Sequence, residues 1–205
     1  GIDNIWVFGQ LTADGEATTG TLELLTKARE LGGSVSAFVG GDAASAAAAL
    51  GDHGAAKVYA TGDLGGALPG VAVASAMQAV IDGGDSPDLV MFPQSYEGRD
   101  VMSRLSVKLD RTVLTNSSSF SVVGDSVTVQ TPVFGGTKLV NSTFTGERPF
   151  LAAFRPKSLV AEGGAGAAGE VVSAPVPDLG ATGGATVTAV HVEETSGPKL
   201  DEAAV

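Results

Sequence analysis

Short apolar runs alternate with helical patterns through the first half of the chain. Four runs are apolar almost throughout, and they cover residues 5–8, 35–39, 57–60 and 89–92. A strand that is apolar on both faces is typical of a parallel sheet with helices on each side. We therefore expect these four runs to be buried strands of one parallel sheet.

Helical patterns fill the intervals between these strands. The first covers residues 20–31, with Thr18 or Thr19 as a candidate cap and Gly32 just beyond its end. Further helices are expected from Asp42 to about Gly51, from Pro69 to about Ile81, and from about Gly98 to Leu109. This alternation predicts a three-layer α/β domain, with flanking helices on a parallel sheet.

Apolar and polar positions alternate with a period of two in the second half of the chain. Residues 120–130 predict a β-hairpin with Gly124-Asp125 at its tip. Further strands are expected at residues 138–144, 150–154, 170–174 and 186–193. We expect this half to be antiparallel and to be added to the parallel sheet or packed beside it.

Composition narrows the classes of partner and chemistry. A chain of 205 residues can bury one substantial core. Its net charge of −11 argues against a nucleic-acid partner, because nucleic acids are bound by clustered Lys and Arg. The absence of cysteine excludes disulfides, thiolate catalysis and iron–sulfur ligation. No apolar run of about 18 residues and no signal-peptide pattern occur, so we expect a cytoplasmic protein without a membrane span.

No motif of a catalytic or metal site stands out. The loop after the first strand, residues 9–15, is neither a dinucleotide fingerprint nor a P-loop. The Gly40-Gly41-Asp42 turn could approach an anion, but a tight turn with Asp42 capping a helix is the favoured interpretation. His53 and His191 lack a second histidine at helical spacing, which favours structural roles over metal binding. An independent enzyme is therefore the least supported function.

Residues 98–111 separate charge from apolar positions. Val101, Leu105 and Leu109 form a core stripe, and the segment carries a net charge of +2 in this acidic chain. Its basic residues are Arg99, Arg104, Lys108 and Arg111. Such a patch either docks an acidic partner or is a solvated helix face, and the residues alone favour the solvated face.

Several motifs in register resemble the electron transfer flavoprotein α subunit family. Gly98-Arg99-Asp100, followed by Arg104-Leu105 and Leu109-Asp110, is similar to the G-R-D-x-x-x-R-L signature of that family. Residues 132–136 (PVFGG), 148–150 (RPF) and 154–156 (FRP) are similar to its later strand motifs. The resemblance covers nearly the whole chain in order, and it identifies the amino-terminal domain of such a subunit.

The resemblance implies a non-catalytic part of an electron carrier. In this family, FAD is held by a following carboxy-terminal domain of the α subunit, and AMP is held by the β subunit of the heterodimer. The complex carries electrons from acyl-CoA and related dehydrogenases of fatty acid β-oxidation to electron transfer flavoprotein:quinone oxidoreductase. No flavin contact transfers onto this chain, so we expect no cofactor, metal or catalytic residue on it and assign partner docking to Arg99, Arg104, Lys108 and Arg111.

The resemblance also suggests domain boundaries. We expect residues 1–194 to form the α/β domain, and residues 195–205, which contain Ser, Gly and Pro, to be a linker to a flavin domain that this chain lacks. The alternative is a stand-alone adenine-nucleotide-binding α/β domain, because the first domains of the two subunits are similar and the β subunit holds AMP. Missing phosphate-loop signatures favour the first interpretation.

Overall fold

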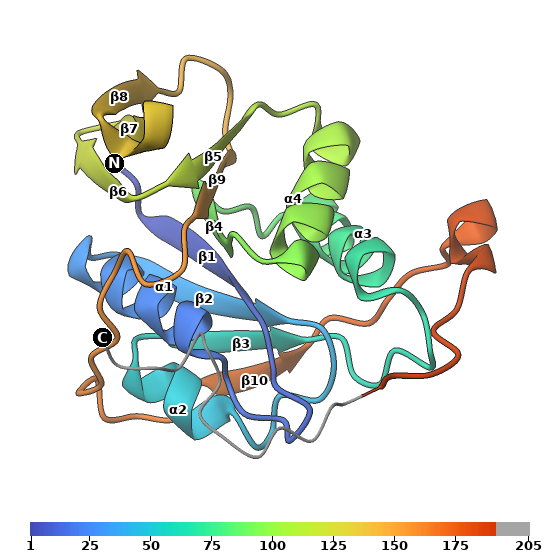
Figure 1. The fold of residues 1–205 in the computed structure, drawn as a ribbon. Helices are drawn as coiled ribbons and strands as arrows, with labels where there is room; N and C mark the ends of the chain where they lie inside the picture. Colours follow the sequence, from blue (N-terminus) through green and yellow to red (C-terminus); the bar gives the residue numbers. More distant parts are fainter. Residues whose placement is uncertain (192–205) are drawn as a thin grey trace.

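The computed structural model describes residues 1–191, which form a seven-stranded sheet between two layers of helices and a separate three-stranded sheet (Figure 1). The larger sheet is parallel throughout, in the order β10-β3-β2-β1-β4-β9-β5. Its strands are β1 (Asn4–Gly9), β2 (Ser34–Val39), β3 (Lys57–Ala60), β4 (Leu89–Pro93), β5 (Val113–Ser117), β9 (Phe150–Phe154) and β10 (Glu170–Ser173). The helices are α1 (Thr19–Glu30), α2 (Ala47–Asp52), α3 (Pro69–Asp82) and α4 (Tyr96–Leu109), with a short 3₁₀ turn η2 (Gly180–Gly184). The predicted three-layer α/β class is confirmed.

The central strands are apolar because both faces of the sheet are covered. In β1, Ile5 and Val7 pack in the layer that holds α1 and α2, whereas Trp6 and Phe8 pack against α3 and α4. All four side chains are fully buried. Burial of apolar surface stabilises the fold by roughly 25 cal/mol per Å², so these two layers supply the main driving force for folding.

Side-chain caps determine where α1 and α4 begin. The Thr18 hydroxyl accepts a hydrogen bond from the Thr21 amide at 3.4 Å, which confirms Thr18 as the cap of α1. The Ser95 hydroxyl accepts from the Gly98 amide at 3.0 Å, so α4 begins at Tyr96, two residues before the predicted start. The predicted start is two residues late because hydrophobic periodicity alone does not reveal a serine cap.

The prediction that Asp42 caps the second helix is wrong. Its carboxylate accepts a hydrogen bond from the Ala44 amide at 2.9 Å and closes a turn, and α2 begins only at Ala47. The short side chains of this alanine-rich stretch bury little apolar surface, so part of it remains as turns rather than as helix.

The second half of the chain is antiparallel only in part. The strand at Phe150–Phe154, expected to be antiparallel, is β9, which pairs parallel with β4 and β5; β10 likewise pairs parallel with β3. All five residues of β9 are buried, and a continuous apolar run of this kind belongs in the interior of a parallel sheet. The strand predicted at residues 186–193 does not form over its described part, where Thr186 makes a single bridge to Ala67; residues 192 and 193 lie outside the described region.

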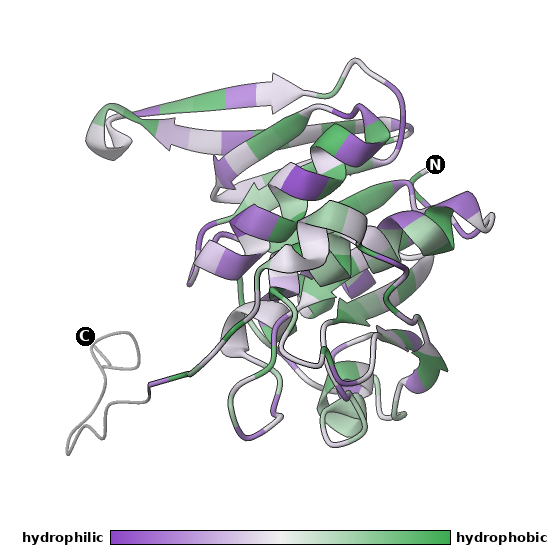
Figure 2. Ribbon diagram, turned by 90° about the vertical axis from the view of Figure 1, so that its right-hand side faces the viewer, coloured by the Kyte–Doolittle hydropathy of each residue, from purple (hydrophilic) through white to green (hydrophobic). Residues whose placement is uncertain are grey.

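The three-stranded sheet is antiparallel, as expected, and we call it the arm. It consists of β6 (Ser119–Val123), β7 (Ser126–Val133), the 3₁₀ turn η1 (Phe134–Gly136) and β8 (Lys138–Thr143). The predicted turn at Gly124-Asp125 joins β6 to β7. At the base of the arm, Phe120, Val127 and Val129 are buried in the core layer that also contains α1, whereas the far part of the arm projects beyond the body of the domain (Figure 2).

Replacing Gly98 with alanine tests the fit of α4 against the sheet. A methyl group at Gly98 would overlap the carbonyl oxygen of Pro93 at the end of β4. Although alanine favours helix, we expect Gly98→Ala to lower the free energy of unfolding by about 1–3 kcal/mol, measured by urea unfolding. The matched control is Gly146→Ala, where a methyl group meets no atom within 4 Å, and its change should stay within about 0.5 kcal/mol. Equal unfolding midpoints for the two variants would contradict this packing.

Candidate functional site

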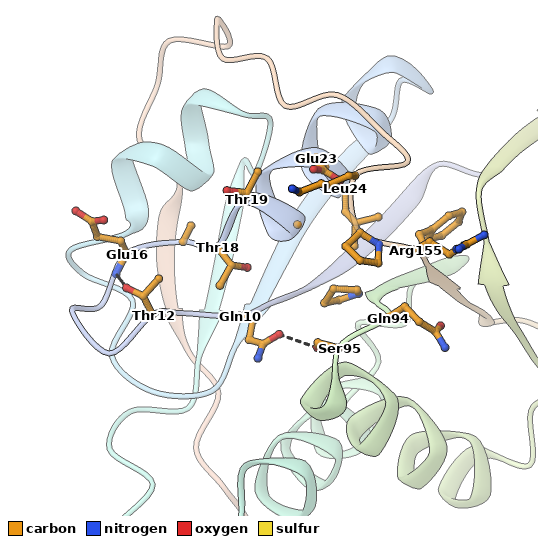
Figure 3. Close-up of a pocket in the computed structure, with 16 residues that line it drawn as sticks. Gln10, Thr12, Glu16, Thr18, Thr19, Glu23, Leu24, Gln94, Ser95 and Arg155 are labelled. Carbon is orange, nitrogen blue, oxygen red and sulfur yellow. Dashed lines mark hydrogen bonds between the residues drawn. The ribbon is translucent and has the colours of Figure 1, made fainter. Parts of the chain in front are cut away.

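A cavity of about 820 Å³ opens at the carboxyl edge of the parallel sheet. The chain leaves β1 through α1 toward β2 on one side, while β4 lies on the other side of β1, so strand order reverses at this point. In open α/β sheets, ligands bind in the crevice outside such a reversal. The cavity, shown in Figure 3, is therefore the candidate ligand site of the domain.

The loops after three neighbouring strands line the cavity. They follow β1, β4 and β9, and the first residues of α1 complete the wall. The lining residues are Gln10, Thr12, Glu16, Ala17, Thr18, Thr19, Gly20, Glu23, Leu24, Pro93, Gln94, Ser95, Phe154, Arg155, Pro156 and Lys157. The lining therefore combines polar side chains with apolar ones, among them Leu24, Pro93 and Phe154.

A hydrogen-bond network joins Gln10, just after β1, to the start of α4 at the edge of the cavity. The Ser95 hydroxyl donates to Gln10 Oε1 at 2.8 Å (Figure 3). Gln10 Nε2 in turn donates to Glu97 Oε2 at 3.1 Å. Burial raises the pKa of Glu97, and the bond from Gln10 opposes that rise. The network places a carboxyl group in the first turn of α4, which disfavours an anionic ligand at that helix start.

On the other side of the cavity, Glu23 is the buried ionisable group. It is 6% exposed, and burial raises its pKa, while the backbone amides of Lys157 and Leu159 oppose the shift. Arg155 and Lys157 lie exposed at the mouth. These groups can hold a polar ligand by hydrogen bonds and charge, but the lining includes no histidine or cysteine that could act as base or nucleophile. Within residues 1–191, no group of three or more His, Asp or Glu side chains is placed to hold a metal ion.

The basic residues predicted from the sequence lie away from this cavity. Arg104 forms an ion pair with Asp100, with 2.8 Å between Nε and Oδ1. Arg99 lies over the exposed ring of Tyr96, 5.0 Å from its centroid. Arg104 is therefore paired within the helix, while Arg99 remains at the surface.

Of the other two predicted basic residues, Lys108 stays exposed and Arg111 is paired. The Lys108 amine donates to Gln78 Oε1 on α3 at 3.2 Å and stays exposed. Arg111 lies beyond the end of α4, where its guanidinium pairs with Glu147 at 3.1 Å and donates to the Arg148 carbonyl at 2.8 Å. Arg111 thus fastens the loop before β9, and the four residues do not form one continuous helix face.

The other sequence candidates have structural partners. The Gly41 amide donates to the Thr61 hydroxyl at 2.8 Å, so the Gly40-Gly41-Asp42 turn is held to the next strand. His53 Nδ1 bonds the Ala49 carbonyl at 2.8 Å within α2. The cavity itself was missed by motif searches, although the polar residues directly after β1 and β4 are a signal that topology could have used.

Comparison with known proteins decides the family. The family model described as "Electron transfer flavoprotein domain" matches residues 5–179. The chain belongs to the electron transfer flavoprotein family. It is 29% identical over 201 residues to the electron transfer flavoprotein subunit alpha of Syntrophomonas wolfei, which covers 98% of this chain and 62% of that protein. The resemblance read from Gly98-Arg99-Asp100 and the later strand motifs is thereby confirmed.

Two further findings concern the extent of this electron transfer flavoprotein chain. It spans about three fifths of the length of the curated α subunit that it matches. None of the helices within residues 1–191 has the length and apolar character needed to cross a membrane. The expected linker, residues 195–205, lies outside the described residues.

The pH dependence of stability tests the burial of Glu23. Because its pKa is raised in the folded state, the protonated form stabilises the fold at low pH, and this contribution is lost as pH rises through the folded pKa. We expect the melting temperature of Glu23→Gln, relative to wild type, to increase from pH 4 to pH 7.5 in calorimetry. The control Glu16→Gln alters an exposed carboxyl on the same cavity and should follow wild type across that range. A wild-type minus Glu23→Gln difference that is constant with pH would contradict the assignment.

Proposed function

We propose that this chain is the amino-terminal scaffold and partner-docking domain of an electron transfer flavoprotein α subunit. In this proposal it works in a heterodimer with a β subunit and serves electron transport from acyl-CoA and related dehydrogenases of fatty acid β-oxidation to electron transfer flavoprotein:quinone oxidoreductase. FAD is held by the carboxy-terminal domain of the intact α subunit, AMP is held by the β subunit, and this chain contributes no catalytic group. The site of action is the cytoplasm, with residues 195–205 linking to the flavin domain.

The arm is the observation that carries the docking role. Four of its large apolar side chains are exposed: Val123 (77%), Phe134 (78%), Leu139 (57%) and Val140 (44%). Phe134, Leu139 and Val140 lie at the far end of the arm. Apolar surface exposed on a projecting element is typical of a protein interface, because its burial against a partner is favourable. The matched family supplies the partner class, namely the β subunit.

The basic residues of α4 support docking of a second kind of partner. Arg99 and Lys108 have no acidic partner within residues 1–191, whereas Arg104 and Arg111 do. Arg99 and Lys108 therefore offer charge to an acidic surface of a dehydrogenase, and Arg104 and Arg111 mainly hold α4 and the loop after it. Exposed charges of this kind steer association more than they strengthen it.

A second candidate function is adenine-nucleotide binding by this domain alone. The cavity at the strand-order reversal favours it, since its volume of about 820 Å³ suits a mononucleotide. Against it stand the loop Gly9-Gln10-Leu11, which lacks a glycine-rich phosphate turn, and Glu97, which places a carboxyl group at the start of α4. We therefore rank it below the docking role.

Association with the β subunit tests the first function. Mixed at micromolar concentrations, this chain and the β subunit of the same organism should elute as a one-to-one complex in size-exclusion chromatography with light scattering. The physical reason is that the exposed side chains of the arm become buried. Separate elution of the two chains at all ratios would overturn the docking role.

Titration of FAD and AMP separates the two candidate functions. The isolated chain should show no saturable binding at micromolar ligand by fluorescence or calorimetry, because neither helix start at the cavity follows a glycine-rich phosphate turn. The chain extended through the flavin domain should purify yellow. Saturable one-to-one binding would favour the nucleotide function, provided that Thr19→Glu in the cavity abolishes it and Thr145→Glu, exposed elsewhere, does not.

A further inference from the structure

Phe134 at the tip of the arm has an unusual backbone conformation. Its φ is +52°, and Gly135 and Gly136 follow with φ of +68° and +88°. Glycine adopts this left-handed region freely, but a bulky aromatic residue there is strained. A glycine at position 134 would form the same turn without that strain.

Within the described residues 1–191, little of the Phe134 side chain is packed, so packing there offsets little of this strain. The ring is 78% exposed and takes part in none of the aromatic pairs formed by residues 1–191. The turn is closed by Thr137 instead, whose hydroxyl donates to the Phe134 carbonyl at 2.9 Å. A strained residue whose side chain is largely exposed points to a contact made with another molecule.

The surroundings of Phe134 fit the core of a protein interface. Leu139 on β8 is paired with Pro132 on β7, close to the tip, and is also exposed. The 26 residues from Ser119 to Phe144 contain two charged side chains, Asp125 and Lys138, in a chain of net charge −11. Interface cores are depleted in charge and enriched in aromatic residues.

We propose that Phe134, supported by Leu139, is the anchor that inserts into an uncharged apolar pocket of the partner. The inference rests on the proposed function, in which that partner is the β subunit. Two copies of this chain would bring two charges of −11 together, which disfavours self-association through the arm. A lipid surface is disfavoured because Lys138 is the single basic residue of the arm, and binding to anionic membranes needs basic clusters.

Affinity measurements on the complex of the full chain with the β subunit test this anchor. Phe134→Ala and Leu139→Ala should each weaken the dissociation constant, by at least tenfold for Phe134→Ala, in calorimetric titration. Val171→Ala is the matched control for Leu139→Ala, because Val171 is also exposed (46%, against 57% for Leu139). Val171 lies on β10, at the edge of the large sheet opposite β5. Its affinity should equal that of wild type.

A second variant separates docking from folding. Phe134→Gly relieves the left-handed strain, so the free chain should melt at the same temperature as wild type or higher, while its affinity falls as far as that of Phe134→Ala. A lower melting temperature would mean that Phe134 serves the fold and would overturn the anchor role.

Three other outcomes separate a failure of the anchor role from a failure of the proposed function. If wild type binds the β subunit and Phe134→Ala binds equally well, the anchor is overturned and the proposed function stands. If wild type does not bind the β subunit, the proposed function falls together with the anchor. If the isolated chain forms dimers that Phe134→Ala abolishes, the arm is a self-association surface and the inference is overturned.

Discussion

The position of β9 between β4 and β5 is the constraint on which the rest of the structure depends. β9 pairs along its length with β4, from Leu89 opposite Phe150 to Pro93 opposite Phe154, and it pairs with β5 on its other side. Its amino end is fixed by Arg148, whose guanidinium donates to Asp88 at 2.6 Å. Asp88 also accepts from the Asp3 and Asn4 amides, and although burial alone would raise its pKa, these bonds hold the pKa below its ordinary value.

The place of β9 in the sheet positions both candidate surfaces. β9 takes the interior place beside β4, and the chain between β5 and β9 forms the arm as a separate sheet. The carboxyl end of β9 brings Phe154, Arg155 and Lys157 to the cavity. The arm and the cavity edge are therefore separate surfaces of the domain, formed by different parts of the chain.

The sequence predicted the elements better than their arrangement. The strands at 5–8, 35–39, 57–60 and 89–92 follow from local apolar runs, and the Gly124-Asp125 hairpin follows from local turn chemistry. The apolar run of β9 carried the same signal of a parallel interior strand, but the alternating strands around it led to an antiparallel prediction. The direction of β10, which is mostly exposed, depends on contacts between residues far apart in the chain. The cavity likewise depends on loops from three strands meeting, and Phe134 became conspicuous only through its backbone angle and exposure.

The docking surface is tested most directly by hydrogen–deuterium exchange of the chain with and without the β subunit. The central claim is that the arm, rather than the cavity edge, is the docking surface. Binding should slow exchange in residues 126–143, which form β7, η1 and β8, and leave residues 9–20 and 94–98 unchanged. Protection confined to the cavity residues, with the arm exchanging as in the free chain, would contradict the account.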